Sequence, residues 1–278
     1  MGYLKKVLAI ILSIVMLVSL IVPTFAAVEN MVEALKLQAI GLMAGEVADL
    51  KLDEGLNRIQ GLVFAIRASG KEKEALTMSD SEVDSILADV IDKDSIPNWA
   101  NGYAQKYVAY AVKNKYTLGT DTKILPKVKF GATDPISGKA FLVFLMKVGM
   151  DHSDVTTNNV VEKAQKARVI TASQAEKYDN DIDIIRDDAA GILYNAAMDG
   201  VKANGENLLQ ALIDSGFVKR QDAVKSGFIN ESIKARVIGV RKIQIEFGYP
   251  VKPENIGIEV VIGDKAITPE SITFCEGN

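Results

Sequence analysis

Apolar residues recur at spacings of three and four over most of the chain, from about residue 29 to residue 217. This spacing puts them on one face of an α-helix, so the pattern predicts amphipathic helices packed on one another. Glycine and polar clusters separate the predicted helices. The clearest segments are residues 31–42, 57–68, 103–114, 139–148, 160–168 and 187–198.

The pattern changes after residue 228. Residues 235–247 alternate partly between apolar and polar side chains, and residues 256–262 and 271–274 are similarly rich in β-branched residues. Proline and glycine between these runs are typical of turns that separate strands. We therefore predict a mainly α-helical body followed by a small β-rich module at residues 228–278, either complete or the first strands of a larger one.

The amino terminus has the three zones of a secretory signal peptide. Lys5 and Lys6 are basic, residues 7–22 are almost wholly apolar, and small residues follow up to Ala26 and Ala27. Basic, apolar and small-residue zones in this order predict export with cleavage after Ala26 or Ala27. A membrane anchor is the alternative, but a spanning helix needs about 20 apolar residues and this run is shorter. We expect residues 1–26 to be removed.

The remaining chain of about 250 residues is long enough for one large or two modest domains. Its composition and charge limit the partners that it can bind. The sequence has 32 basic and 36 acidic residues, a formal net charge of −4. Nucleic-acid binding needs a clustered basic surface, so this balance argues against nucleic acid. Cys275 is the only cysteine, which excludes an intrachain disulfide. Stability must then come from burial, which an apolar fraction of 48% permits.

Three places in the helical region have the features of a capped helix start. At a helix N-terminus one side chain accepts a backbone N–H, and an acid or amide three residues later reaches back. Asn57 and Gln60 fit this capping box fully. At the second place Ser137 can cap the helix, but Ala140 has no side-chain acceptor for the return bond. At the third place Ile185 cannot cap, and only the acid, Asp188, is present.

An arginine directly follows the cap at two of the three places. Arg58 and Arg186 occupy this position, whereas Gly138 occupies it at the second place, with Lys139 beside it. Free N–H groups and the positive end of the helix dipole favour an anion at such a point, and an arginine adds to this. The alternative interpretation is that the arginines are surface residues that only support the helix starts.

These features together resemble the S-layer homology (SLH) domain. The likeness covers residues 28–217 as three degenerate repeats, bounded at about 28–79, 80–150 and 151–227. It is found in the three helix starts, which are similar to the Ile-Thr-Arg-Ala-Glu motif of that family. It is found also in the turn at residues 40–45, in Trp99-Ala100, in residues 107–112 and in Gly119.

The resemblance implies a fold, a function and a set of binding residues. Three helix–loop–helix repeats would pack as a pseudo-trimeric bundle that binds anionic secondary cell-wall polymer, commonly with a pyruvylated sugar. Such binding holds a secreted protein on Gram-positive peptidoglycan at the cell surface. Strands like residues 243–247 resemble the immunoglobulin-like modules that often follow such repeats. The candidate polymer-binding residues are Arg58, Gln60, Arg186, Asp188, Trp99, Lys139, Ser137 and Asn57.

Within this set the repeats differ. Arg58 and Arg186 match the motif arginine, and Gln60 and Asp188 match its acid, whereas Gly138 departs from the motif. Trp99, the only tryptophan, is expected to pack in the core rather than to form a platform for a sugar ring.

Catalytic chemistry has little support in the residues present. His152 is the only histidine, and no Gly-x-Ser-x-Gly motif accompanies it. One histidine and one cysteine cannot supply a usual metal-ligand set. The acidic stretch 179–183 lacks the glycine and glutamate of an EF-hand loop, so we expect a solvated loop there. We predict a non-catalytic binding protein without a cofactor.

Two other functions are compatible with the sequence. The first is a structural surface-layer protein that acts mainly by self-assembly through its β module. The second is a wall-active glycoside hydrolase, which would use a pair of carboxylates that nothing in the sequence singles out.

Overall fold

The computed structural model describes residues 28–44, 50–99, 102–230, 233–239, 242–247, 260–262 and 265–267, together with Ser271 and Thr273. The predicted signal segment, Gly45, Ala100 and Cys275 lie outside these residues. The chain forms two compact units, Met1–Lys219 and Arg220–Asn278. The predicted fold class is confirmed at the level of a mostly helical chain with small antiparallel sheets near the C-terminus.

Helices make up the first unit, and all six segments singled out by periodicity are helical to within a few residues. The helices α4, α5, α9 and α11, of five to eight residues, lie in the region predicted to be helical but outside the six segments. The α-helices are α2 (Met31–Ala39), α3 (Arg58–Ala68), α4 (Glu72–Leu76), α5 (Asp80–Leu87), α6 (Tyr103–Lys113), α7 (Gly138–Phe144), α8 (Val160–Lys166), α9 (Ala172–Asp179), α10 (Arg186–Asp199) and α11 (Leu208–Asp214). Two 3₁₀ turns, η1 (Lys93–Ser95) and η3 (Thr122–Ile124), and one π turn, η4 (Leu145–Gly149), complete the described elements of this unit.

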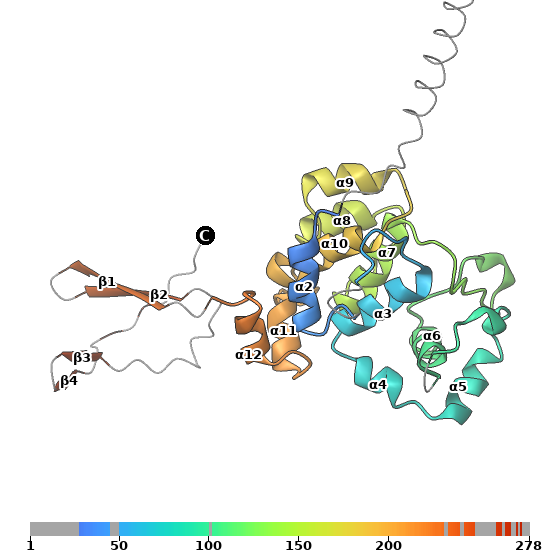
Figure 1. Ribbon diagram of the computed structural model, residues 1–278, viewed down its shortest axis with the longest axis horizontal. Coiled ribbons are helices and arrows are strands. Elements are labelled where there is room, and N and C mark those ends of the chain that lie inside the picture. The colour runs from blue at the N-terminus through green and yellow to red at the C-terminus, as the bar shows by residue number, and fades with distance from the viewer. Residues whose placement is uncertain are drawn as a thin grey trace, which may run out of the picture. The chain divides into compact units, whose positions relative to one another are not determined.

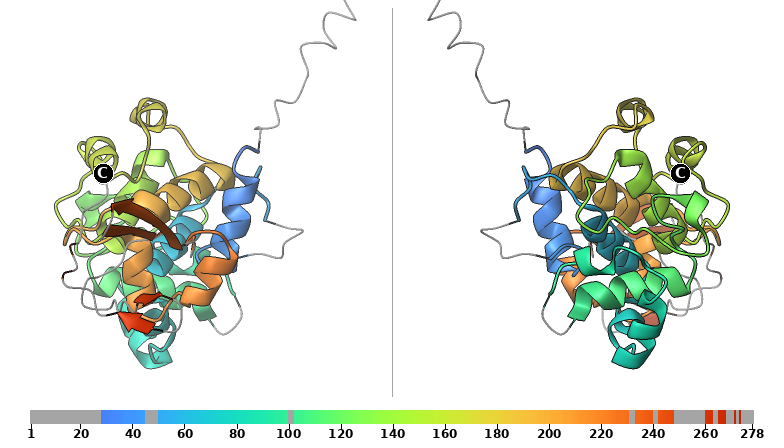
Figure 2. Two further views of the ribbon diagram at one scale, coloured as in Figure 1. Left: turned by 90° about the vertical axis from the view of Figure 1, so that its left-hand side faces the viewer. Right: turned by 90° about the vertical axis from the view of Figure 1, so that its right-hand side faces the viewer.

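The helix α3 has the most extensive packing in this unit. It contacts α6, α7 and η4, whereas α10 packs against α2 and α11, and α7 packs against α8 and α9. In Figures 1 and 2, α4, α5 and α6 lie at one end of the unit and α8 and α9 at the other. None of the helices in the described part of the chain is long and apolar enough to cross a membrane.

The predicted caps at the three helix starts are present. The Asn57 side chain accepts from the Gln60 N–H at 3.0 Å, and Gln60 Oε1 accepts from the Asn57 N–H at 3.1 Å. Ser137 Oγ accepts from the Ala140 N–H at 3.3 Å. At α10 only the reverse bond forms, from the Ile185 N–H to the Asp188 carboxylate at 3.2 Å. The capping prediction is thus confirmed at all three places.

The residues just before these caps are joined by a closed ring of backbone hydrogen bonds, here called the inner ring. The Leu56 N–H donates to the Ile184 carbonyl at 2.9 Å, and Ile184 donates to Ile136 at 3.1 Å. Ile136 in turn donates to Leu56 at 3.1 Å, which closes the ring. Each of the three side chains is only 1% exposed. Segments far apart in sequence therefore meet at one buried point.

A second set of bonds, the outer ring, runs in the opposite cyclic direction, and its donors lie two residues further along each segment. The N–H groups of the three residues that follow the caps donate to carbonyls in the segment that precedes the neighbouring cap. The bonds are Arg58 to Asp134 at 2.9 Å, Gly138 to Ile182 at 2.8 Å and Arg186 to Glu54 at 2.9 Å. The first residues of α3, α7 and α10 thus occupy equivalent positions around the rings.

The second unit begins with α12 (Arg220–Lys225) and contains two hairpins. Strands β1 (Ile233–Gly239) and β2 (Lys242–Phe247) pair antiparallel, as do β3 (Val260–Ile262) and β4 (Lys265–Ile267). The predicted strand at 235–247 is therefore two strands, and the one at 256–262 is a strand in its described part. The strand expected at 271–274 is wrong at both described positions, because Ser271 and Thr273 are not in a strand.

The inner ring generates a stability prediction with a matched control two residues away. Ile184→Ala removes a fully buried side chain, so we expect a loss of about 2–5 kcal/mol in the free energy of unfolding. Ile182 is 41% exposed on the same segment, so Ile182→Ala is expected to cost less than about 0.5 kcal/mol. Urea unfolding followed by circular dichroism measures both. Equal losses in the two variants would contradict the central role of the ring.

Candidate functional site

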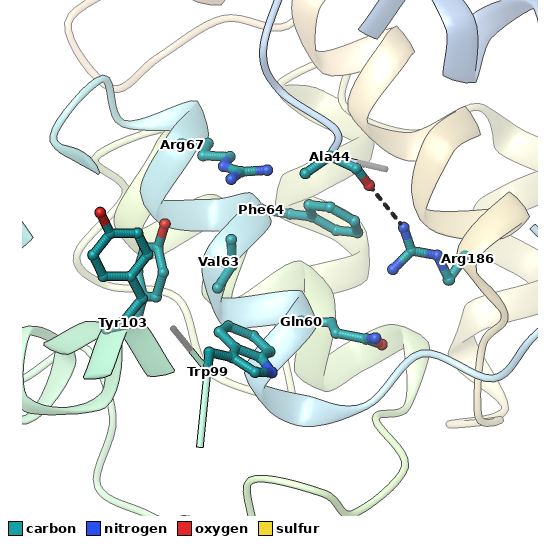
Figure 3. A pocket seen from close by; sticks show the side chains of 9 residues that line it. Ala44, Gln60, Val63, Phe64, Arg67, Trp99, Tyr103 and Arg186 are labelled. Atoms are coloured by element: carbon teal, nitrogen blue, oxygen red, sulfur yellow. Dashed lines mark hydrogen bonds between the residues drawn. The ribbon is translucent and has the colours of Figure 1, made fainter. Parts of the chain in front are cut away.

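The first unit contains an open cavity of about 270 Å³ (Figure 3). The helix α3 supplies one wall, because residues 60, 63, 64 and 67 are spaced to share one helical face. The helix α6 supplies Tyr103 and Tyr107 from the same face one turn apart. The lining is completed from three further segments. The lining residues are Ala44, Gln60, Val63, Phe64, Arg67, Trp99, Tyr103, Tyr107 and Arg186.

Arg186, a predicted binding residue, lies at one side of this cavity and is 8% exposed. Its Nε donates to the Leu50 carbonyl at 2.8 Å, and one terminal amino group donates to the Ala44 carbonyl at 3.3 Å. The guanidinium carbon lies 5.6 Å from the centre of the Phe64 ring, in cation–π range. Arg186 therefore fixes the loop after α2 as well as presenting positive charge to the cavity.

Arg67 is a second cation of the cavity, and sequence reasoning missed it. Its Nε donates to Glu72 Oε1 at 2.7 Å, and both side chains are about one-fifth exposed. The Tyr107 hydroxyl donates to the same carboxylate oxygen, and burial followed by this hydrogen bond raises the pKa of Tyr107. Glu72 thus holds the Arg67 guanidinium at the cavity through its Nε. Figure 3 shows Arg67 and Arg186 on either side of Phe64.

Aromatic side chains form the opposite side of the cavity. Trp99 is half-buried, and its ring meets that of Tyr107 edge to face, with centroids 6.5 Å apart. Tyr103 is 38% exposed, whereas Tyr107 is buried. Because indole and phenol rings combine a flat apolar face with a polar edge, this side suits a ligand with both kinds of surface, such as a sugar ring.

Arg58 occupies the position in α3 that Arg186 occupies in α10, and its surroundings are similar. Its guanidinium carbon lies 4.8 Å from the centre of the Phe144 ring, and a terminal amino group donates to Thr117 Oγ1 at 3.4 Å. Its Nε is buried and has no hydrogen-bond partner among the described residues. Burial lowers the pKa of Arg58, and the charges of Asp134 and Asp92 oppose this. The guanidinium remains charged at neutral pH.

Gly138 occupies the third equivalent position, and the structure explains why no arginine stands there. A Cβ atom on Gly138 would lie 2.5 Å from Cδ1 of Tyr178 and 2.9 Å from Cγ. The Tyr178 ring is 1% exposed and its hydroxyl donates to Asp188 at 3.1 Å. The space used by the arginine side chain at the other two positions is therefore filled by Tyr178.

The remaining predicted residues lie outside the cavity, except Gln60, which lines it while capping α3. Lys139 forms an ion pair with Asp179 at 3.2 Å near the occupied third position. Asp188 accepts from Lys177 and Tyr178, so its charge is already paired. Asn57 and Ser137 serve as helix caps. The predicted set is thus not brought together in one place, and its members divide between the cavity and the three helix starts.

Three lining residues, Val63, Phe64 and Arg67, could have been inferred from the sequence. They follow Gln60 at helical spacing within a segment predicted to be a helix, and so share its face. The pairing of this face with Trp99 and Arg186 depends on the packing of α3 against its neighbours, which no local pattern encodes. The described residues contain no cluster of three or more His, Cys, Asp or Glu side chains that could hold a metal ion.

Comparisons of this chain with models of known protein families, with curated proteins and with solved structures find no match.

The packing of Gly138 on Tyr178 generates a second prediction. Gly138→Ala forces the Tyr178 ring to move, so we expect the free energy of unfolding to fall by about 1–3 kcal/mol. A Cβ on Gly55, which lies on the neighbouring segment of the rings, meets nothing within 4 Å. Gly55→Ala is therefore the matched control, with an expected change below about 0.5 kcal/mol. Thermal and urea unfolding measure the stability of both variants. If Gly138→Ala is as stable as the unmodified protein, Tyr178 does not close this position.

Proposed function

We propose that this chain is a secreted, non-catalytic protein that attaches to the Gram-positive cell wall by binding an anionic wall polymer. The observation that carries the proposal is the cavity in which Arg67 and Arg186 lie opposite Trp99 and Tyr103. Guanidinium groups form charge-assisted hydrogen bonds with carboxylates and phosphates, whereas flat rings pack on sugar faces. One cavity thus offers both kinds of contact that an acidic glycan needs.

The rings of hydrogen bonds support packing of three repeats as in SLH domains. Three helix starts at matching positions donate to one another in two rings of opposite cyclic direction, with equivalent bonds of 2.8–3.1 Å. Residues 28–79, 80–150 and 151–227 each supply one of these starts. We infer that the three segments are divergent copies of one helix–loop–helix unit arranged about a pseudo-threefold axis, as the family resemblance implies.

This arrangement makes each arginine–phenylalanine contact the product of two repeats. Arg58 of the first repeat lies over Phe144 of the second, and Arg186 of the third lies over Phe64 of the first. Phe64 and Phe144 have the same place in their helices, six residues after Arg58 and Gly138 respectively. The third pair would join Gly138 to Ile192, which provides neither a cation nor an aromatic ring. Two positions are therefore proposed to bind polymer and the third is not.

The lining of the cavity favours binding over hydrolysis. Glycoside hydrolases of the usual kind need two carboxylates that flank the scissile bond. The lining residues of this cavity include no aspartate, glutamate or histidine. A wall-active hydrolase is thus the less supported alternative for this site.

Arg67 provides the sharpest test, because Arg186 also holds the loop after α2 and its removal would mix folding with binding. Arg67→Gln removes the charge, and the loss of a charge-assisted bond worth about 1.5–3 kcal/mol predicts roughly tenfold to hundredfold weaker wall binding. Trp99→Ala is expected to weaken binding as well. Co-sedimentation of the purified protein with Gram-positive walls, before and after removal of the secondary polymer, measures both effects.

The matched control is Arg168→Gln, which removes an exposed arginine that does not line the cavity and should bind as the unmodified protein does. Thermal unfolding of each variant separates lost binding from lost structure. Binding that survives removal of the polymer, or an Arg67→Gln variant that binds as tightly as Arg168→Gln, would overturn the proposal.

A further inference from the structure

The hairpin of β1 and β2 has one apolar face that is exposed in its described residues. The register places Ala235 opposite Ile245 and Val237 opposite Ile243, so these four residues share one face. Val237 is 76% exposed and Ile243 is 49% exposed. An isolated hairpin is at best marginally stable in water, so an apolar face of this kind calls for additional strands.

The opposite face of the hairpin carries a polar, internally bonded pair. Arg236 and Gln244 lie opposite each other, and the guanidinium of Arg236 donates to Gln244 Oε1 at 3.0 Å and 3.3 Å. Among the strands that the structure describes, β1 pairs with β2 and β3 with β4. The outer edge of β2 therefore presents backbone donors and acceptors to any strand that can match its two faces.

We propose that β2 pairs antiparallel with β2 of a second copy of this chain, in a register centred on Gln244. This register places Ile243 of each copy opposite Ile245 of the other on the apolar face. It also places Lys242 of each copy opposite position 246 of the other, which is a glutamate. Opposite charges and apolar pairs at facing positions are the contacts that stabilise neighbouring strands.

Other registers are poorer on the same grounds. A shift by one residue would set the apolar face of one strand against the polar face of the other. A shift by two in either direction would lose the facing opposite charges. Self-pairing of β1 is unfavourable because it sets Arg236 opposite either Arg236 or Lys234 of the second copy. The β2 edge is thus the self-complementary one, and its twofold symmetry closes the assembly at a dimer.

The dimer forms one four-stranded sheet in the order β1-β2-β2-β1, with the apolar faces of both hairpins on the same side. A sheet of this size is expected to be more stable than either hairpin alone. The association goes beyond wall binding and does not depend on it. Where both occur, a dimer carries twice the number of polymer sites and gains from their effective concentration.

A charge exchange at the interface tests the proposal in the absence of walls. Lys242 faces Gly239 within its own hairpin, so Lys242→Glu leaves the hairpin intact but sets glutamate against glutamate between copies. We expect analytical ultracentrifugation to find a monomer–dimer equilibrium for the unmodified protein. Lys242→Glu should raise the dimer dissociation constant about tenfold or more. Lys225→Glu, an equal charge change at an exposed position of α12, should leave it unchanged.

Mixing two variants gives the decisive result. Glu246 faces Lys234 within its own hairpin, so Glu246→Lys is combined with Lys234→Glu to keep opposite charges there. Lys242→Glu and this double variant should each dimerise poorly alone, whereas their equimolar mixture restores opposite charges at both facing pairs and should form a heterodimer. Pairing of β2 with β1 of another copy would instead give open-ended assemblies that Lys242→Glu does not weaken. Such open-ended assemblies would overturn the proposal. So would an unmodified protein that stays monomeric at all concentrations, or a mixture that associates no more than its two components do.

Discussion

The inner and outer rings of backbone hydrogen bonds are the constraint on which the first unit depends. They join three segments separated by tens of residues in the sequence, and they do so at the helix starts, where N–H groups have no partner within the helix. Leu56, Ile136 and Ile184 remove the inner ring from water, so each of its bonds would be costly to leave unmade. The rings therefore fix the direction in which α3, α7 and α10 leave the centre, and with it the place of each first-turn side chain.

The first-turn side chains then make contacts between segments that lie far apart in the chain. Arg58 and Arg186 extend from the rings across an aromatic ring of the neighbouring repeat to its loop, where Thr117 or the carbonyls of Ala44 and Leu50 receive them. A cation held over a phenylalanine contributes about 0.5–2 kcal/mol, depending on its exposure to water. These packing contacts explain why Arg186 is largely buried although it borders the cavity. Arg67 is held differently, by an ion pair with Glu72.

Local signals in the sequence predicted the elements and the caps well, and long-range geometry poorly. The apolar spacing located six helices because each buries one face, and Asn57, Gln60, Ser137 and Asp188 form the bonds that their spacing predicted. Arg67 and Tyr103 were not foreseen, because each appears in the sequence as an ordinary helical residue until α3 packs against α6. The single strand expected at 235–247 failed for another reason: partial alternation continues through the hairpin, so periodicity does not mark the turn.

Gly138 keeps the backbone bond of its position in the rings but not an arginine side chain. Its N–H makes the same outer-ring bond as those of Arg58 and Arg186, so the backbone of the third position is intact. The side chain alone is lost, and Tyr178 fills the space while bonding to Asp188, the acid of the next helix start. Burial, followed by the charge of Asp188, raises the pKa of Tyr178, so the phenol stays protonated and keeps donating to that carboxylate. The bonding role of the motif is thus separable from its charge: the rings need the backbone at all three positions, whereas a cation is needed only where a ligand is to be held.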